Sequence, residues 1–207
     1  MNTDQIHELL YQALETELGG VQVYTTAIDC AANDDLREEW QGYLDETKNH
    51  VTIVQGIFSE LGLDPSVETP GRSIVRMKGE ALVKAMKSAM SSGDEILAQL
   101  VAAECVVDAE IKDHANWELI GEVAGEVKGR MAKTLQEAYE QVEEEEDEHL
   151  YHTQGWAREL WFESLGITAV LPPPEEQKKV KTAIGAARAE QAREEMIKSG
   201  SGSKSQK

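Results

Sequence analysis

Carboxylates and histidines recur one helical turn apart in this sequence. Three such pairs lie on apolar stripes: Glu46 with His50, Glu110 with His114, and Glu145 with His149. Residues four apart on an α-helix share a face and lie about 6 Å apart along the axis, so both can reach one ion. Oxygen and imidazole ligands without thiolate suit iron or manganese, and they also bind zinc. The spacing therefore predicts a metal site.

Each of these glutamates, together with Glu17, interrupts an apolar stripe that has helical spacing. The first stripe reads Leu10, Leu14, Glu17, Val21, Tyr24 and Ile28. An unpartnered carboxylate is costly to bury, so each needs a partner. A single glutamate of this kind is best explained by a Tyr, Trp or Arg partner. Four in register favour a metal site over a buried polar network that holds no metal.

The stretch from Glu137 to Trp156 contains eight acidic residues and two histidines. The helical period puts Glu145 on the apolar stripe and Glu146 close to it, whereas the other acids should mostly face water. Glu146 also precedes His149 by three residues. The sequence leaves open which of these two glutamates is the ligand.

Further residues are candidates to support the ligands by packing or hydrogen bonding. They are Tyr24, Glu104, Trp117 and His152. Tyr24 and Trp117 each follow a candidate glutamate by seven residues, and His152 is either a ligand or a support. No catalytic residue separate from the metal ligands is expected.

Long helices must position these residues. Only five prolines occur, and roughly a hundred residues between Pro70 and Pro172 contain none, which permits long helices. The apolar spacing predicts helices over about 3–32, 34–61, 94–124 and 128–165, a shorter crossover helix over 74–90, and a last helix over 175–197. No alternating β pattern competes, so the predicted class is all-α. Two antiparallel hairpins joined by a long connection describe a four-helix bundle of the ferritin-like kind.

Length and composition favour one domain with an appendage. Residues 1–170 are the predicted bundle, and residues 171–207 are an accessory C-terminal helix with a flexible tail, "SGSGSKSQK". The net charge of -19 opposes binding to nucleic acid or an anionic membrane and favours cations. Cys30 and Cys105 form no disulfide framework or zinc-binding spacing. No signal peptide or transmembrane run is visible, so a cytoplasmic protein is expected.

Several segments share their order and spacing with a known family. They are "ETELGGVQVY", "YLDETKNHVTIVQGIFSELG", "IVRMKGEALVKAM", and "AEI" followed by "LQEAYEQVEEEEDEH". In these segments the chain resembles the ferritin-like di-iron carboxylate proteins, and within them it is most similar to the YciE/YciF-type bacterial stress proteins. The likeness covers about residues 10–155, the predicted bundle only.

The resemblance implies a set of ligands. They would be the carboxylates of Glu17, Glu46, Glu110 and Glu145 and the imidazoles of His50 and His149. Family members place the acid three residues before the histidine, whereas Glu46 is four before His50 and position 47 is a threonine. On the third long helix Val107 stands where the family would have a second acid, and Glu104 and His114 are the substitutes.

The resemblance also implies a function. Two iron ions, with manganese or zinc as alternatives, would react with dioxygen or peroxide in a ferroxidase or oxidase that serves a bacterial stress response. A homodimer is expected, without nucleic acid or membrane partners. The alternative is a ferritin-like scaffold or binding protein that is not an enzyme, holds a structural metal or none, and binds a partner through its charged C-terminal arm. Redox activity at a two-metal site separates the two hypotheses.

Overall fold

The computed structural model of the protein describes residues 1–203, and the side chains of residues 1–198. The described residues contain helices and no strand, which confirms the all-α class. The helices are α1 (Thr3–Cys30), α2 (Asp34–Leu61), α3 (Pro70–Met90), α4 (Glu95–Glu126), α5 (Arg130–Ser164), α6 (Pro174–Gln177) and α7 (Ala183–Ser203). The bounds of the four long helices differ from the predicted ones by no more than two residues.

Capping side chains explain where several helices begin. The side chains of Asn2, Asn33, Thr69 and Asp94 accept hydrogen bonds from backbone N–H groups in the first turns of α1, α2, α3 and α4. Such caps satisfy N–H groups that have no partner within the helix. At the other end of α2, Gly62 has a φ of 69°, the left-handed conformation that glycine adopts without a Cβ clash.

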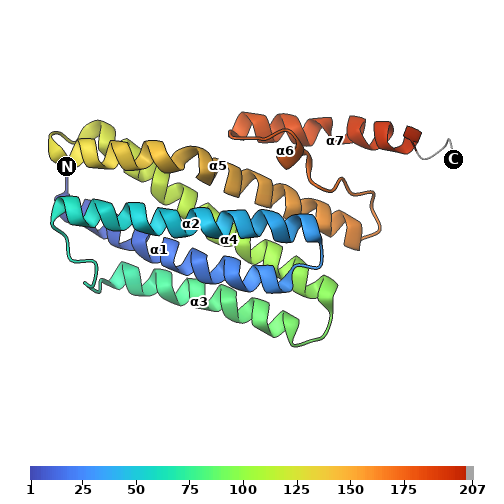
Figure 1. Cartoon of the computed structure of the whole chain (residues 1–207), viewed down its shortest axis with the longest axis horizontal. Coiled ribbons are helices and arrows are strands. Elements are labelled where there is room, and N and C mark those ends of the chain that lie inside the picture. Colours follow the sequence, from blue (N-terminus) through green and yellow to red (C-terminus); the bar gives the residue numbers. More distant parts are fainter. Residues whose placement is uncertain (204–207) are drawn as a thin grey trace.

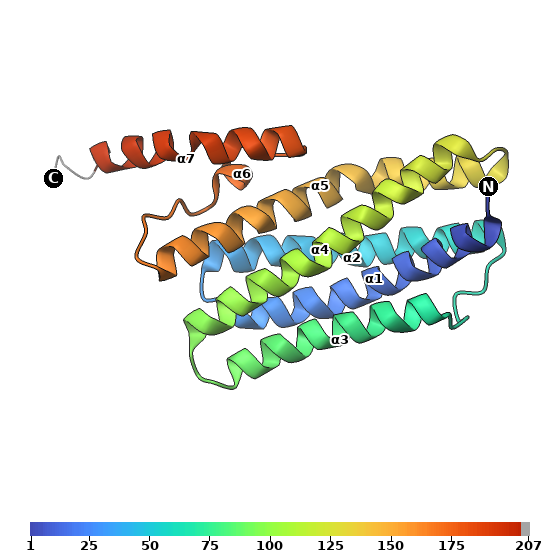
Figure 2. The same ribbon diagram turned by 180° about the vertical axis from the view of Figure 1, so that it is seen from behind.

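Four long helices run alongside one another around a common interior (Figures 1 and 2). Helix α1 contacts α2 and α4, and α5 contacts the same two helices. Helix α3 lies outside this group, against α1 and α4, while α6 and α7 lie on the opposite side against α5. The chain therefore forms two hairpins, α1–α2 and α4–α5, which α3 connects.

The C-terminal arm, residues 171–203, differs from the prediction. The expected continuous helix over 175–197 is wrong, because the chain leaves the helical path between α6 and α7, where Lys179 has a φ of 50°. The buried Val180 accounts for the break, since its carbonyl oxygen lies 3.1 Å from Nε2 of His152 on α5. The tail was expected to be flexible, yet residues 199–203 belong to α7, and residues 204–207 lie outside the described part of the chain.

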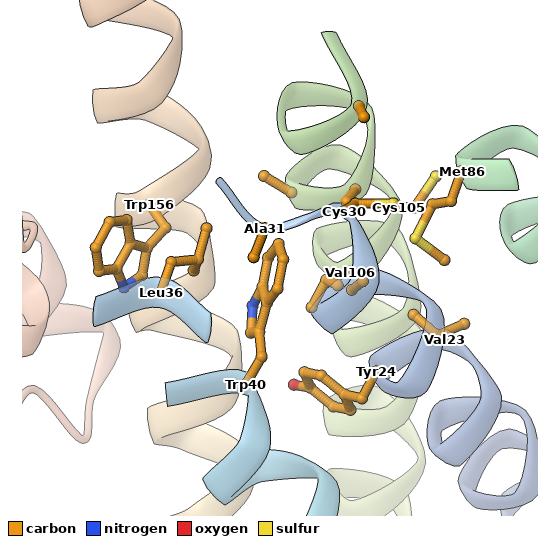
Figure 3. Packing of buried hydrophobic residues seen from close by; sticks show 14 of the residues in the cluster. Val23, Tyr24, Cys30, Ala31, Leu36, Trp40, Met86, Cys105, Val106 and Trp156 are labelled. Atoms are coloured by element: carbon orange, nitrogen blue, oxygen red, sulfur yellow. The ribbon is translucent and has the colours of Figure 1, made fainter. Parts of the chain in front are cut away.

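Two apolar clusters fill the interior, one toward each end of the bundle. The first surrounds Trp40 and Trp156. Figure 3 shows these two residues together with Leu36 and Tyr24. The second surrounds Phe58 and Trp117. The middle of the bundle, between the two clusters, is polar. Among the described residues, no helix is long and apolar enough to cross a membrane.

Candidate metal centre

The polar middle of the bundle is a layer of buried acids and histidines contributed by all four long helices. Glu17 comes from α1, His50 from α2, Glu110 from α4, and Glu146 and His149 from α5. Each is at most 3% exposed. Charged groups are rarely buried this deeply unless they are paired or bind metal.

The layer contains two compact groups that share one carboxylate. Glu17, His50 and Glu146 form the first group, and Glu110, Glu146 and His149 form the second; within each group the candidate ligand atoms lie within 4.8 Å of one another. Glu146 Oε1 is 3.0 Å from Nδ1 of His50 and 3.7 Å from Nδ1 of His149. A carboxylate in this position can serve two ions at once.

The two histidines are oriented by glutamates on the facing helix. Nε2 of His50 on α2 lies 2.7 Å from Glu145 Oε2 on α5, and Nε2 of His149 on α5 lies 2.7 Å from Glu46 Oε2 on α2. An ionised carboxylate only accepts hydrogen bonds, so each Nε2 carries a proton and donates it. Nδ1 then faces the interior and can offer a lone pair to a metal once its own proton has left, which is the arrangement that carboxylate–histidine–metal sites use.

Ligand atoms of all five residues lack hydrogen-bond partners among the described residues. They are Glu17 Oε2, His50 Nδ1, Glu110 Oε2, Glu146 Oε2 and His149 Nδ1. Nor does any described lysine or arginine form an ion pair with the three glutamates. Buried polar atoms are nearly always satisfied, and ligand atoms left unpartnered this close together could hold a metal ion. The residues present therefore fit a metal site.

The pKa values of the metal-free layer reflect crowding of like charge. Burial and the charge of Glu146 raise the pKa of Glu17 well above its ordinary value and that of Glu110 to about 7. Burial alone would lower the pKa of both histidines. The surrounding carboxylates outweigh it and raise the pKa of His50 and His149 to about 9. In the metal-free protein, bound protons thus partly neutralise the negative charge of the layer. A metal ion that binds there must displace these protons.

Two aromatic residues predicted as supports lie beside the ligands. Trp117 Nε1 donates a hydrogen bond of 2.8 Å to Glu17 Oε1. Tyr24 is fully buried, and its ring packs edge-on against that of His149 at a centroid distance of 6.0 Å. Trp117 therefore fixes one oxygen of Glu17 and leaves the other directed to the interior.

The structure places three other predicted residues outside the layer. His114 pairs through Nε2 with Asp147 at 2.7 Å, and Glu104 accepts a hydrogen bond from Trp161. His152 contacts Tyr43 and Glu39 through Nδ1, and its Nε2 faces the C-terminal arm. None of the three belongs to a compact group of possible ligands.

The two glutamates left open by the sequence have different positions. Glu146 is 2% exposed and belongs to both groups, whereas the side chain of Glu145 is 40% exposed and contacts the far side of His50. Glu46 on α2 has the same role as Glu145, since its side chain is 41% exposed and contacts His149.

Asp113 is an interior residue that the sequence reasoning missed. It lies on α4, is 4% exposed, and its Oδ1 has no hydrogen-bond partner among the described residues. The sequence did contain a signal for an inward-facing Asp113, because this residue follows Glu110 by three positions and so shares its helix face.

Two surface hollows lie near the layer. A polar hollow of about 190 Å³ has the buried Glu146 in its wall, together with His114, Asp147 and Tyr151. A wider hollow of about 700 Å³ has Glu46, which contacts His149, in its wall. Both walls are rich in acidic side chains, which raise the local concentration of cations.

Comparison of the chain with models of protein families, with curated proteins and with solved structures found no match. The chemistry of the site itself must therefore carry the functional conclusion.

Proposed function

We propose that this protein is a metal-binding protein of the ferritin-like kind whose interior layer holds two metal ions. The observation that carries the proposal is the set of five buried, unpartnered ligand atoms around Glu146. In each compact group two carboxylates and one imidazole converge, and this donor set suits iron or manganese.

The protein's own residues have defined roles in this proposal. Glu146 would help to hold both ions, Glu17 and His50 would hold one of them, and Glu110 and His149 would hold the other. Glu46 and Glu145 hold the imidazoles with Nδ1 toward the interior. The two apolar clusters exclude bulk water from both sides and so strengthen electrostatic interactions within the layer.

Bound iron or manganese would supply redox chemistry with dioxygen or peroxide, as in an oxidase or ferroxidase. The order of the helices supports the ferritin-like assignment. Two antiparallel hairpins are joined through α3, which runs the length of the bundle, so that α2 and α4 point the same way (Figures 1 and 2). One long crossover of this kind is a property of ferritin-like bundles.

Anaerobic titration with Fe(II) tests the proposal. Protein freed of metal with a chelator should bind two Fe(II) ions per chain, and exposure to air should then produce the near-ultraviolet absorbance of oxo-bridged ferric ions. If two ions bind and no oxidation signal appears, the proposed metal site is kept and the proposed oxidase role is excluded. No binding of Fe(II), Mn(II) or Zn(II) would overturn the proposal in favour of a scaffold that works through partners.

A further inference from the structure

We propose that Asp113 is the carboxylate that balances the charge of the ion held by Glu17 and His50. This inference rests on the proposed function and adds to it a residue that the two compact groups do not contain.

The first argument is the position of Asp113 within the layer. Asp113 follows Glu110 by three residues and precedes Trp117 by four, and all three are buried on α4. Trp117 in turn donates its hydrogen bond to Glu17. Asp113 therefore lies on α4 between Glu110, a ligand of one ion, and Trp117, which supports Glu17, a ligand of the other ion. Burial and the charges of Glu17, Glu146 and Glu110 raise the pKa of Asp113 well above its ordinary value.

The second argument is that the described side chains do not neutralise Asp113. No lysine or arginine of the described residues forms an ion pair with it. The charge of Lys112 acts against the raised pKa of Asp113, but its ammonium forms no ion pair with Asp113 and donates a hydrogen bond to Asn116. Oδ1 of Asp113 also has no partner in the described part of the chain. An ionised carboxylate in this situation needs a cation that the described side chains do not supply.

The third argument is an asymmetry between the two hairpins. On α5, Glu146 stands three residues before His149, but on α2 the residue three before His50 is Thr47. Thr47 is buried, its hydroxyl donates to the carbonyl oxygen of Tyr43 at 2.8 Å, and its methyl group lies against Gly20. The α1–α2 hairpin thus contributes one carboxylate fewer to the two compact groups, and α4 carries a second buried acid, Asp113, three residues after Glu110.

The fourth argument is the charge of the layer as a whole. Glu17, Glu110 and Glu146 are the acids of the layer, and Asp113 is a further buried acid on the Glu110 face of α4. When ionised, these four residues carry four negative charges. Two divalent cations carry four positive charges, so with neutral histidines the loaded layer is neutral. Without Asp113 one positive charge would remain in a region shielded from water, which is unfavourable. Glu46 and Glu145 compensate less because their side chains are about 40% exposed and are screened by solvent.

The test compares Asp113→Asn with Asp108→Asn. Asparagine keeps the shape of the side chain and removes its charge. Asp108 is an exposed acid on the same helix and serves as the matched control. Chelator-treated proteins are titrated with Co(II), an air-stable probe ion, and ions per chain and affinity are measured by calorimetry and elemental analysis. Thermal melts in chelator provide a second readout that needs no metal.

We expect wild type and Asp108→Asn to bind two Co(II) ions per chain and Asp113→Asn to bind its second ion at least 10-fold more weakly. Metal-free Asp113→Asn should melt at or above the wild-type temperature, since burial and neighbouring acids disfavour the charged form of Asp113 and asparagine is neutral. Two ions bound to Asp113→Asn with wild-type affinity would overturn this inference alone. A metal-free variant that melts below wild type would overturn it as well, because Asp113 would then stabilise the fold. Wild type that binds no Co(II) would overturn the proposed function and the inference together.

Discussion

Glu15 and Glu17 are two residues apart on α1, and both are buried, but their surroundings are opposite. Glu15 faces α3, where Arg72 contacts it at 2.6 Å and Arg76 at 2.7 Å. Glu17 faces the interior, where its partners among the described residues are His50, the indole N–H of Trp117 and other acids, with no ion pair to arginine or lysine. The arginines lower the pKa of Glu15 against the effect of burial, whereas burial and Glu146 raise that of Glu17. Burial alone therefore does not identify a metal ligand. A buried carboxylate that lacks a lysine or arginine partner is the better indicator.

The largest effect should come from the carboxylate that both ions share. Replacing Glu146 by Gln should weaken binding of both ions by more than about 100-fold, since even residues that only support ligands contribute about 10- to 100-fold. Titration with Fe(II) or Mn(II) measures the loss. Glu140→Gln, an exposed position on the same helix, is the control and should bind as wild type does. If Glu146→Gln kept one ion at full affinity, Glu146 would serve one ion and not two.

Replacing Glu15, the glutamate paired with arginines, should lower the stability of the fold and leave metal binding unchanged. Glu15→Gln leaves the buried Arg72 without its acid, and loss of one partner of a buried ion pair typically costs about 3 kcal/mol or more in the free energy of unfolding. Chemical denaturation measures the change, and the number of bound ions should stay at the wild-type value. Glu68→Gln, which removes an exposed partner of Arg76, should cost less than about 1 kcal/mol. Loss of metal binding in Glu15→Gln would show that the two regions are not independent.

A smaller effect is expected where glutamates act through histidines. Glu46→Gln and Glu145→Gln keep a hydrogen-bond acceptor but remove its charge, which makes the imidazole a weaker ligand. Each should lower the affinity of one ion by about 10-fold, Glu46→Gln through His149 and Glu145→Gln through His50. Titrations of the single and double variants would show two separate losses. If both variants weakened the same ion, the assignment of the histidines to different ions would be wrong.

The smallest effect should be the pH dependence of the metal-free protein. The pKa of Glu110 is raised from 4.5 to about 7 and that of His50 from 6.5 to about 9. A group with a raised pKa in the folded protein stabilises it fully below its unfolded value, and this stabilisation is lost as the pH rises through the folded value. Between about pH 6 and 9 the melting temperature in chelator should therefore fall. Metal should reverse the trend, because it binds the deprotonated ligands. If the chelator-treated protein became more stable between about pH 6 and 9, the raised pKa values of Glu110 and His50 would be contradicted.

The regular part of the fold was predictable because its signals are local. Asn33 begins α2 and Gly62 ends it, and both residues lie in the sequence where the predicted helix begins and ends. The arm was not predictable in the same way. Its break follows from contacts of Val180 with α5, and a burial partner distant in sequence leaves no periodic signal.

The candidate site was predictable to within about one residue on each helix. Adjacent residues differ by about 100° around a helix, so Glu145 and Glu146 both lie near the apolar stripe, and only packing decides which of them faces inward. On α4 the sequence pointed to His114, whereas the structure turns Asp113 inward. Helix α4 contacts α1, α3 and α5, so it has apolar residues on more than one face. The stripe that should mark the interior is therefore weak there.

The hydrogen bonds around the layer also determine when the site can form during folding. They connect residues far apart in the chain: His50 with Glu145 over 95 positions, Trp117 with Glu17 over 100, and His149 with Glu46 over 103. Contacts within each hairpin are closer in sequence and close smaller loops, which is faster. We therefore expect the two hairpins to form before the layer does. The nascent chain would then acquire its metal only after its last helices have docked.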